Sequence, residues 1–526
     1  MGFLLYGVPH LLPDFAADIV YRRRRRQPHE PISRALIRMK PPFDIAGDLD
    51  TPVSAFAKLE PFAPCFLLES VEGGERLGRY SFIGFGERLH VRLDAQGLTV
   101  AESSGAAGGA GAAAGGGTST RSPPPASQAE LLAALRAALA RVPQPRPTLE
   151  QVPLAGGLVG FAAYDIVRYF ERLPTIAAAQ PGLPLLHYVA PRSLLVFDHV
   201  SRGIALLHAG SEAERAALRA EVIAALRGPV PRRAPAGRFA VPTPALGREI
   251  YCAGVRRVQE YIAAGDVYQL VLASRFAGEH TLDPFQVYRA LRLINPSPYM
   301  YFCRLDDLTV VGSSPEALVK LSAGQAELRP IAGTRPRHDD PERDAALEAE
   351  LRADAKENAE HVMLVDLARN DLGRVAAAGS VRVQPYRSIE RYSHVMHMVS
   401  GVRGRLAPGR DAFDLFAASF PAGTLVGAPK VRAMQIIEEL EPDRRNIYGG
   451  CIGYFAANGT MDTCIGLRTA LVKDGMMHVQ AGAGIVADSE PEFEFEECRQ
   501  KARALVRAAE EAVRFAAGKG GGNNAR

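Results

Sequence analysis

The chain has 526 residues, which is too many for one hydrophobic core and enough for two or three domains. Its 47% apolar and 23% charged residues are typical of a soluble globular protein, and a net charge of only +4 argues against nucleic acid as the main partner. Six scattered cysteines without a CxxC pair favour reduced thiols over disulfides, and no apolar run is long enough to span a membrane. We therefore expect a cytoplasmic protein.

The first part of the chain joins an arginine-rich extension to a strand-rich segment. Residues 1–38, which include RRRRR, are expected to be a disordered or misannotated extension. Residues 39–227 are expected to form an N-terminal domain, because segments 59–71 and 79–86 have the aromatic and aliphatic composition of strands. Residues 103–127 are rich in Gly, Ala, Ser and Pro, which predicts a surface loop inside this domain.

A second domain is predicted after a linker rich in proline, arginine and glycine at residues 228–246. This domain is expected over residues 247–515, and residues 516–526 are expected to be a disordered tail. Short strands alternate there with long helices, a mixture that favours an α+β fold over a doubly wound sheet. The predicted helices lie at 129–142, 248–264, about 341–370 and about 411–419, and the predicted strands include 266–276 and 451–455.

Two acidic pairs with helical spacing stand out in the second domain. Glu494 and Glu497 follow the glycines of GAGIVADSEPEFEFEE at a predicted strand-to-helix turn, and Glu357 and Glu360 lie in KENAEHVMLVDLARND. Residues three apart share one face of a helix, so two such pairs could hold one hard cation between them. Backbone amides of the glycines could bind an anion nearby. A small polyanionic substrate is the expected ligand of such a site.

Ordinary structural roles remain open for these residues. Asp354 and Glu357 have the spacing of a capping box, and Pro491 followed by several glutamates is what a helix N-terminus favours. A strand histidine such as His397 is more often structural than catalytic, although its pKa range suits a general acid. Arg468 could grip a carboxylate or be a strand-edge charge, and Tyr448 could donate its hydroxyl or pack in the core.

Eight segments together resemble the chorismate-utilising enzymes, and among them the anthranilate synthase component I group. The resemblance extends over nearly all of residues 43–515. It implies that family's fold, a β-sheet sandwich core flanked by helices with an N-terminal regulatory region. The segments are LLES at 67–70, GRYSFIG at 78–84, NPSPYMYF at 295–302, PIAGT at 330–334, AEHVMLVDLARNDLG at 359–373, SHVMH at 393–397, PAGTLVGAPK at 421–430 and GAGIVADSEPEFEFEE at 482–497.

Two positions distinguish members of the resembled family. Aminodeoxychorismate synthases carry a nucleophilic lysine where this chain has Ala332, and isochorismate and salicylate synthases carry a lysine base where it has Gln269. Without either lysine, the chain is expected to convert chorismate and ammonia to anthranilate and pyruvate, a lyase reaction and the first step of tryptophan biosynthesis. The alternatives are aminodeoxychorismate, isochorismate or salicylate synthesis, or a non-catalytic tryptophan-sensing subunit.

The resemblance also implies a set of site residues. Catalytic roles are implied for His397, which would protonate the departing C4 hydroxyl, and for Thr334 and Glu357. Mg²⁺ is the implied cofactor, with Glu360, Glu494 and Glu497 as its ligands. Chorismate binding is implied for Gly333, Thr334, Tyr448, Arg468, Gly482, Ala483, Gly484 and Lys501.

A separate partner and an inhibitor are implied in the same way. The sequence contains no GxCxG elbow with a downstream HxE, so ammonia is expected to come from a separate glutamine amidotransferase subunit, in a heterotetramer. L-Tryptophan is the implied feedback inhibitor. It would bind Ser70 of LLES together with Pro298, Tyr299 and Met300 of NPSPYM.

Overall fold

The computed structural model describes residues 42–71, 78–103, 118–180, 182–231, 237–392 and 395–516. The expected N-terminal extension, most of the low-complexity segment and all but the first residue of the expected C-terminal tail lie outside these ranges. The described ranges contain ten α-helices: α1 (Pro52–Lys58), α2 (Gln128–Ala140), α3 (Glu212–Arg227), α4 (Arg248–Ala263), α5 (Pro284–Ile294), α6 (Pro341–Ala353), α7 (Ala355–Gly373), α8 (Ala412–Ser419), α9 (Lys430–Leu440) and α10 (Pro491–Ala516).

The strands of the first half of the described chain alternate with few helices. They are β1 (Ile45–Ala46), β2 (Phe66–Glu69), β3 (Tyr80–Asp94), β4 (Gly97–Ser103), β5 (Ser119–Ser122), β6 (Gly157–Ala162), β7 (Leu186–Asp198), β8 (Gly203–His208) and β9 (Thr243–Pro244). Short 3₁₀ helices are η1 (Glu60–Phe62), η3 (Tyr164–Tyr169) and η4 (Gly423–Leu425). Strand β5 pairs with β4, so the end of the predicted low-complexity loop continues the sheet.

The second half supplies the remaining strands. They are β10 (Gln269–Glu279), β11 (Tyr299–Leu305), β12 (Leu308–Ser314), β13 (Ala317–Ser322), β14 (Gln325–Leu328), β15 (Ile331–Pro336), β16 (Arg382–Val383), β17 (Ser388–Arg391), β18 (Val395–Val399), β19 (Val402–Arg405), β20 (Gly427–Ala428), β21 (Cys451–Ala456), β22 (Met461–Ile465), β23 (Thr469–Lys473) and β24 (Met476–Ile485).

Antiparallel pairing joins 21 of the described strands into one continuous ladder, and β15, β18 and β17 form a separate three-stranded sheet. The ladder runs from β10 through β24, β23, β12, β11, β2, β3, β7, β6, β21, β22 and β13 to β14. It therefore folds back on itself as the two layers of a sandwich. The predicted α+β sandwich fold is confirmed.

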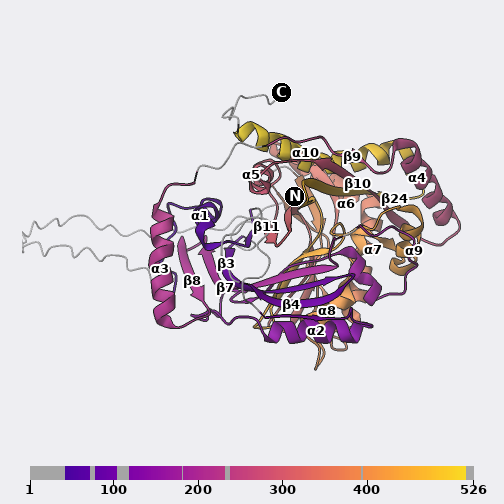
Figure 1. Cartoon of the computed structure of the whole chain (residues 1–526). Coiled ribbons are helices and arrows are strands. Elements are labelled where there is room, and N and C mark those ends of the chain that lie inside the picture. The colour runs from indigo at the N-terminus through magenta and orange to yellow at the C-terminus, as the bar shows by residue number, and fades with distance from the viewer. Residues whose placement is uncertain are drawn as a thin grey trace, which may run out of the picture. The chain divides into compact units, whose positions relative to one another are not determined.

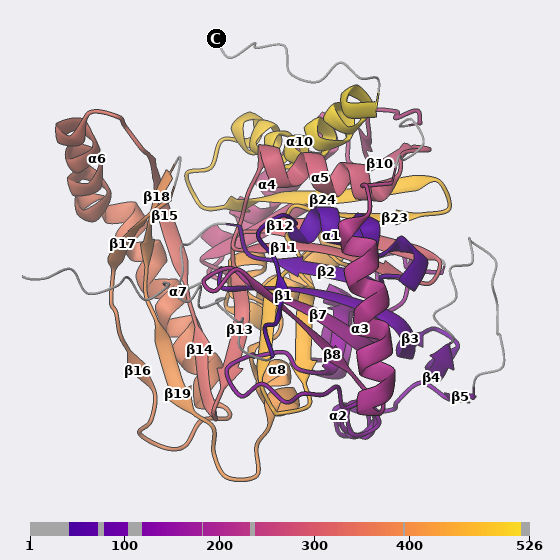
Figure 2. The same ribbon diagram turned by 90° about the vertical axis from the view of Figure 1, so that its left-hand side faces the viewer.

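Strands in the middle of this ladder are buried on both faces. Phe66 and Cys303 point into one hydrophobic cluster, whereas their neighbours Leu67 and Phe302 point into another. Because side chains alternate across a strand, the first cluster fills the space between the layers and the second lies under the helices. Figures 1 and 2 show α4, α5 and α10 side by side over β10 and β24.

Both predicted domains contribute to the sandwich. Strand β2 pairs with β11, and β6 pairs with β21, so strands from before and after the predicted linker are direct neighbours. Residues 39–526 accordingly group as one compact unit. The division of the chain at residues 228–246 into a regulatory and a catalytic region stays a prediction.

One predicted helix is divided in two. The segment predicted as a helix over about 341–370 forms α6 and α7, because Asp354 adopts an extended conformation between them (φ −64°, ψ 115°). Its side chain accepts hydrogen bonds from the backbone N–H groups of Lys356 and Glu357 and so caps α7. This cap fixes where Glu357 and Glu360 emerge from the helix.

Candidate active site

The two acidic pairs lie at the N-terminal ends of two helices. Glu357 and Glu360 lie in the first two turns of α7, and Glu494 and Glu497 lie in the first two turns of α10. Burial and then the charge of Glu357 raise the pKa of Glu360, and burial and then the charge of Glu497 raise the pKa of Glu494. Each helix thus holds two carboxylates close enough to repel one another.

Shared cations show that the two pairs face a common space. Lys356 and Lys501 lower the pKa of both Glu360 and Glu494, although these glutamates belong to different helices. Lys501 pairs with Glu497 at 2.6 Å and donates a hydrogen bond to the backbone oxygen of Gly482 at 3.2 Å. A half-buried cluster of mutually repelling carboxylates suits a hard divalent cation, which would relieve that repulsion.

The glycines of GAGI lie inside strand β24 and not at a turn. Gly482, Ala483 and Gly484 pair with residues of β10, and the strand continues to Ile485, so the predicted turn at these glycines is wrong. Because these glycines lack a Cβ, the side chains of Tyr448 and Gln269 can pack against the backbone of β24. A Cβ on Gly482 would lie 2.9 Å from the hydroxyl of Tyr448, and a Cβ on Gly484 would meet the Gln269 amide at the same distance.

Tyr448 and Gln269 therefore pack directly on the glycine backbone. The side-chain amide of Gln269 also forms a hydrogen bond with Glu360, which connects β10 to the carboxylates of α7. Tyr448 is 4% exposed, and burial raises the pKa of its hydroxyl, so it stays a neutral donor. The bare glycine faces, a phenol, an amide and Lys501 form a polar floor beside the carboxylates.

His397 lies opposite Thr334 in the three-stranded sheet. A bulge in β15 falls at Gly333, which has a φ of +73° that favours glycine. The Nδ1 atom of His397 lies 3.0 Å from the Thr334 hydroxyl and 3.2 Å from the Gly333 oxygen. A Cβ on Gly333 would approach the Glu357 carboxylate to 3.2 Å, so this sheet edge adjoins α7.

Glu357 is also part of a structural ion-pair network. Arg335 contacts Glu357 at 3.3 Å, Asp354 at 2.8 Å and Glu350 at 2.8 Å, and so fixes the junction of α6 and α7 against β15. Glu357 therefore shares its charge with a neighbouring guanidinium. This arrangement suits a wall of the site better than a metal ligand.

Arg468 lies between β22 and β23 in a left-handed conformation with a φ of +46°. Non-glycine residues rarely adopt this conformation, and it is often found at functional positions. The side chain of Arg468 is exposed and donates a hydrogen bond to Asn295 at 3.2 Å. This bond places the guanidinium beside Asn295, the residue that follows α5.

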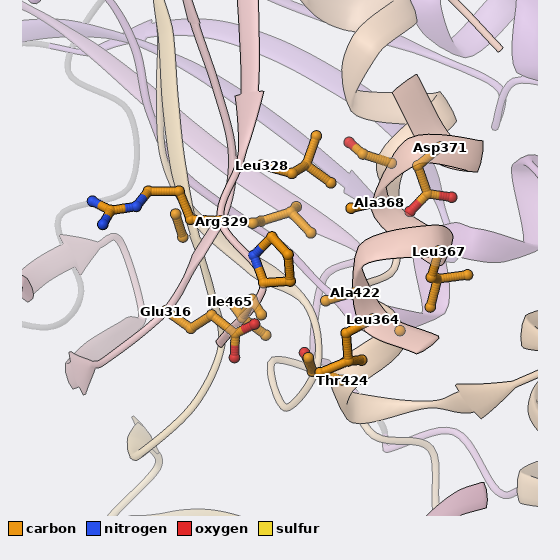
Figure 3. A pocket seen from close by; sticks show the side chains of 15 residues that line it. Glu316, Leu328, Arg329, Leu364, Leu367, Ala368, Asp371, Ala422, Thr424 and Ile465 are labelled. Carbon is orange, nitrogen blue, oxygen red and sulfur yellow. The ribbon is translucent and has the colours of Figure 1, made fainter. Parts of the chain in front are cut away.

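The sequence did not single out Glu316, which lines a small cavity of about 40 Å³ (Figure 3). Burial raises its pKa to about 8. Pro330 of PIAGT and Gly423 and Thr424 of PAGT line the same cavity. A glutamate within an SSPE turn carries no spacing signal, so only the folded structure reveals that burial raises the pKa of this carboxyl.

A buried arginine was also missed from the sequence. Arg445 is 2% exposed, pairs with Glu441 at 2.6 Å and donates hydrogen bonds to the backbone oxygens of Leu425 and Val271. Its guanidinium lies 5.5 Å from the ring centre of Tyr448. Arg445 therefore holds β10 and the PAGT segment in place behind the polar floor.

The residues expected to bind tryptophan meet at a second cavity of about 390 Å³. Pairing of β2 with β11 sets Met300 opposite Glu69, which brings LLES next to NPSPYM. Ser70, Pro298, Tyr299 and Met300 all line this cavity. The Tyr299 hydroxyl donates to Asp462 at 2.9 Å, and Lys320 pairs with the same carboxylate at 3.0 Å. The volume suits a small molecule.

The sequence matches the family described as chorismate binding enzyme over residues 64–507. The chain belongs to the chorismate-binding enzyme family. Two similar relatives are named anthranilate synthase component 1: that of Thermus thermophilus is 48% identical over 88% of this chain and 96% of its own, and that of Acetivibrio thermocellus is 42% identical over 89% and 94%.

Solved structures agree with this family and fold. Anthranilate synthase component I from Streptococcus pneumoniae has a TM-score of 0.70 and 32% identity, covering 88% of this chain and 98% of its own. The menaquinone-specific isochorismate synthase from Escherichia coli, with a TM-score of 0.62 and 21% identity over 88% and 92%, shares the fold. Of the helices within the described ranges, none has the length and apolar character needed to cross a bilayer.

Proposed function

We propose that this chain is the large subunit of an anthranilate synthase, which converts chorismate and ammonia to anthranilate and pyruvate. The observation that carries the proposal is the similarity, nearly end to end, to relatives named anthranilate synthase component 1. Gln269 supports the choice among activities: a neutral amide hydrogen-bonded to Glu360 occupies the position where the resembled isochorismate and salicylate synthases carry a lysine base.

Glu360, Glu494 and Glu497 are the proposed ligands of Mg²⁺. Their fit rests on carboxylates that face one space and whose pKa is raised at Glu360 and Glu494. Mg²⁺ bound there would neutralise and orient a substrate carboxylate. Lys501, which contacts Glu497 and Gly482, would bring a second positive charge to the same place.

The second carboxylate of chorismate is assigned to Arg468 and Tyr448 together with the backbone of Gly482, Ala483 and Gly484. Arginine binds carboxylates through paired hydrogen bonds, and a buried phenol donates one more. Any side chain at Gly482 or Gly484 would occupy the space above the strand. This floor therefore admits a flat ring with two acidic arms.

His397 is the proposed proton donor. Ammonia adds at C2 of the ring, and the C4 hydroxyl leaves as water once it accepts a proton. Thr334 and the Gly333 oxygen hold the Nδ1 side of the imidazole and so fix the ring in the site. Loss of the enolpyruvyl group as pyruvate, with loss of the C2 proton, then gives the aromatic product. Glu316, a carboxyl whose pKa is raised by burial, lines the PIAGT–PAGT cavity.

A separate glutaminase subunit is the proposed ammonia source, and tryptophan is the proposed inhibitor bound in the 390 Å³ cavity. The inhibitor residues lie on or next to β2 and β11, which are paired strands of the sandwich. Tryptophan bound there would favour an arrangement of the sheet that binds chorismate poorly.

Incubation of the purified chain with chorismate, Mg²⁺ and ammonium tests the function. Fluorescent anthranilate and stoichiometric pyruvate are expected. Formation of aminodeoxychorismate, isochorismate or salicylate would refute the proposed activity. Absence of turnover with retained tryptophan binding would point to a sensing subunit instead.

A further inference from the structure

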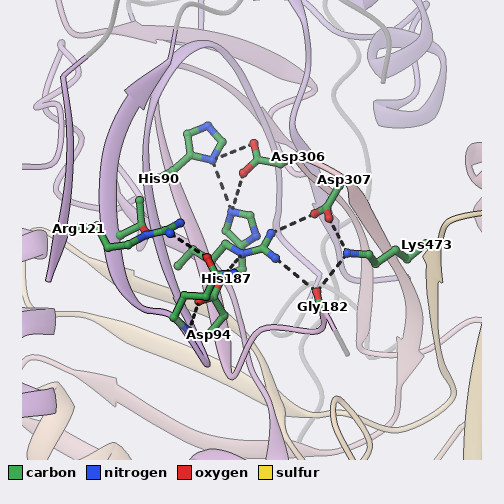
Figure 4. Close-up of polar contacts among 11 residues, drawn as sticks. His90, Asp94, Arg121, Gly182, His187, Asp306, Asp307 and Lys473 are labelled. Carbon is green, nitrogen blue, oxygen red and sulfur yellow. Dashed lines mark hydrogen bonds and ion pairs between the residues drawn. The ribbon is translucent and has the colours of Figure 1, made fainter. Parts of the chain in front are cut away.

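Three polar side chains from separate parts of the chain meet in one cluster. His90 comes from β3, His187 from β7, and Asp306 from the tight turn between β11 and β12 (Figure 4). The Nδ1 atom of His90 lies 3.2 Å from one oxygen of Asp306, and Nε2 of His187 lies 3.4 Å from the other. These two nitrogens are 3.4 Å apart.

This spacing matches a tetrahedral metal site. Zinc binds imidazole nitrogens at about 2.0–2.1 Å, so two such ligands at a tetrahedral angle lie about 3.3–3.4 Å apart. The two imidazole nitrogens are already at that separation, and the ligand atoms of all three residues lie within 4.8 Å of one another. Two imidazoles and one carboxylate suit zinc and its divalent transition-metal neighbours.

The cluster combines buried histidines with an accessible carboxylate. His187 is fully buried and His90 is 6% exposed, whereas the Asp306 side chain is 46% exposed. Asp306 has a φ of +54°, a conformation that the two-residue turn imposes and that directs it to this place. An ion could enter from the exposed side and keep water as a fourth ligand.

Neighbouring charges are arranged around the cluster without occupying it, with one exception. Arg92 and Lys473 pair with Asp307, the next residue of the turn, at 3.0 and 2.6 Å. Arg88 is the exception, because its Nε donates to Nε2 of His90 at 3.2 Å. Because Nε2 of His90 accepts this bond, the ring proton lies on Nδ1, the atom that faces Asp306. An ion must displace that proton to bind, so the contact with Arg88 opposes metal binding.

We propose that His90, His187 and Asp306 form a binding site for one divalent transition-metal ion of the zinc class, separate from the Mg²⁺ site. The ion would tie the β11–β12 turn to β3 and β7. Those strands belong to the same sandwich as the strands that line the 390 Å³ cavity. The site thus stabilises the sheet and takes no part in the reaction.

Cobalt titration of the full chain tests the site. Protein stripped with a chelator is titrated with Co²⁺ in excess Mg²⁺, which saturates the oxygen-rich carboxylate cluster. One equivalent of Co²⁺ should give the intense visible absorption of a four-coordinate site with nitrogen ligands, and Zn²⁺ should remove it. If the spectrum shows no more than the weak absorption of six-coordinate Co²⁺, the proposal is wrong.

Variants assign the ligands. Asp306→Asn and His90→Gln should each weaken Co²⁺ and Zn²⁺ binding by at least about tenfold. Asp307→Asn, in the same turn but outside the cluster, should leave binding unchanged, and Arg88→Gln should tighten it. Zn²⁺ should raise the unfolding temperature of the unmodified chain but not of Asp306→Asn. Equal affinity in Asp306→Asn and the unmodified chain would refute the site, and circular dichroism checks that each variant is folded.

Discussion

At the scale of single residues, the four glutamates of α7 and α10 have unequal environments. Glu357 pairs with the largely buried Arg335, whereas Glu497 pairs with the exposed Lys501. Side chains that a cation can recruit without breaking a fixed guanidinium pair are the better ligands. The ion pair with Arg335 therefore makes Glu357 the least suitable metal ligand of the four. We propose Glu360, Glu494 and Glu497 as the ligands, with Glu357 beside them.

Glu497→Gln should abolish anthranilate formation, because it removes a proposed Mg²⁺ ligand and leaves the fold intact. We expect a fall of at least about a hundredfold in ammonium-dependent turnover, measured by fluorescence. Glu496→Gln is the matched control, because Glu496 pairs with exposed Arg499 on the same helix. Full activity of Glu497→Gln would exclude this residue from the metal site.

Glu316→Gln should change how stability depends on pH. The pKa of Glu316 is raised from its ordinary 4.5 to about 8, mainly by burial. Between these values the native state holds a proton that the unfolded chain releases, so stability falls as pH rises, by at most about 1.4 kcal/mol per pH unit.

Thermal unfolding between pH 5 and 9 measures this effect. The unmodified chain should lose stability over that window more steeply than Glu316→Gln. Glu327→Gln is the control, because Glu327 lies in an ion pair with the exposed side chain of Arg403. Parallel curves for the chain and Glu316→Gln would mean that Glu316 is ionised in the native state.

At the scale of elements, β24 shows why two glycines are needed in a regular strand. Neither Gly482 nor Gly484 has a positive φ, so neither position needs the backbone freedom of glycine. Their contribution is the missing Cβ, which lets the Tyr448 hydroxyl and the Gln269 amide reach the strand. The floor of the site depends on this contact.

Gly482→Ala should therefore disturb the site and cost about 1–3 kcal/mol of stability, because its Cβ would meet the Leu272 oxygen at 2.8 Å and the Tyr448 hydroxyl at 2.9 Å. Chemical denaturation and turnover with ammonium measure both effects. Gly373→Ala at the end of α7 is the control, since a Cβ there meets nothing within 4 Å. Normal turnover in Gly482→Ala would show that the glycine face is not part of the substrate site.

At the scale of the whole described unit, the sandwich makes the two halves of the chain interdependent. Strand β11 has β2 as a neighbour, and β21 has β6. Residues 247–515 expressed alone would expose both strand edges and the apolar faces beside them. We expect this fragment to be insoluble or inactive, as judged by size-exclusion chromatography and turnover. A soluble, active fragment would show that the second half folds independently.

The 390 Å³ cavity lies among these shared strands. Ser70→Arg should relieve inhibition by tryptophan and leave ammonium-dependent activity nearly unchanged, because a long charged side chain would fill part of the cavity. Inhibition curves for anthranilate formation measure the effect, with a rise of at least about tenfold in the inhibitory concentration as the expected result. Ser322→Arg, at an exposed position at the end of β13, is the control. Unchanged sensitivity of Ser70→Arg would remove the cavity from regulation.

The sequence by itself determined the family, the α+β sandwich and the acidic pairs. Helical spacing places Glu494 and Glu497 on one face whatever surrounds them, and the motif order identifies the family because each segment keeps its place along the chain. The split between α6 and α7 was within reach of the same reasoning, since Asp354 has the pattern of a helix cap.

Tertiary structure alone decided which distant residues meet. The raised pKa of Glu316 arises from burial, and the cluster of His90, His187 and Asp306 arises from the pairing of β3 with β7 and the position of one turn. Neither burial nor long-range register has a local sequence signal, because both depend on how the sandwich closes. The role of the glycines in β24 followed from the same closure, which brought Tyr448 and Gln269 against a strand that the sequence had suggested was a turn.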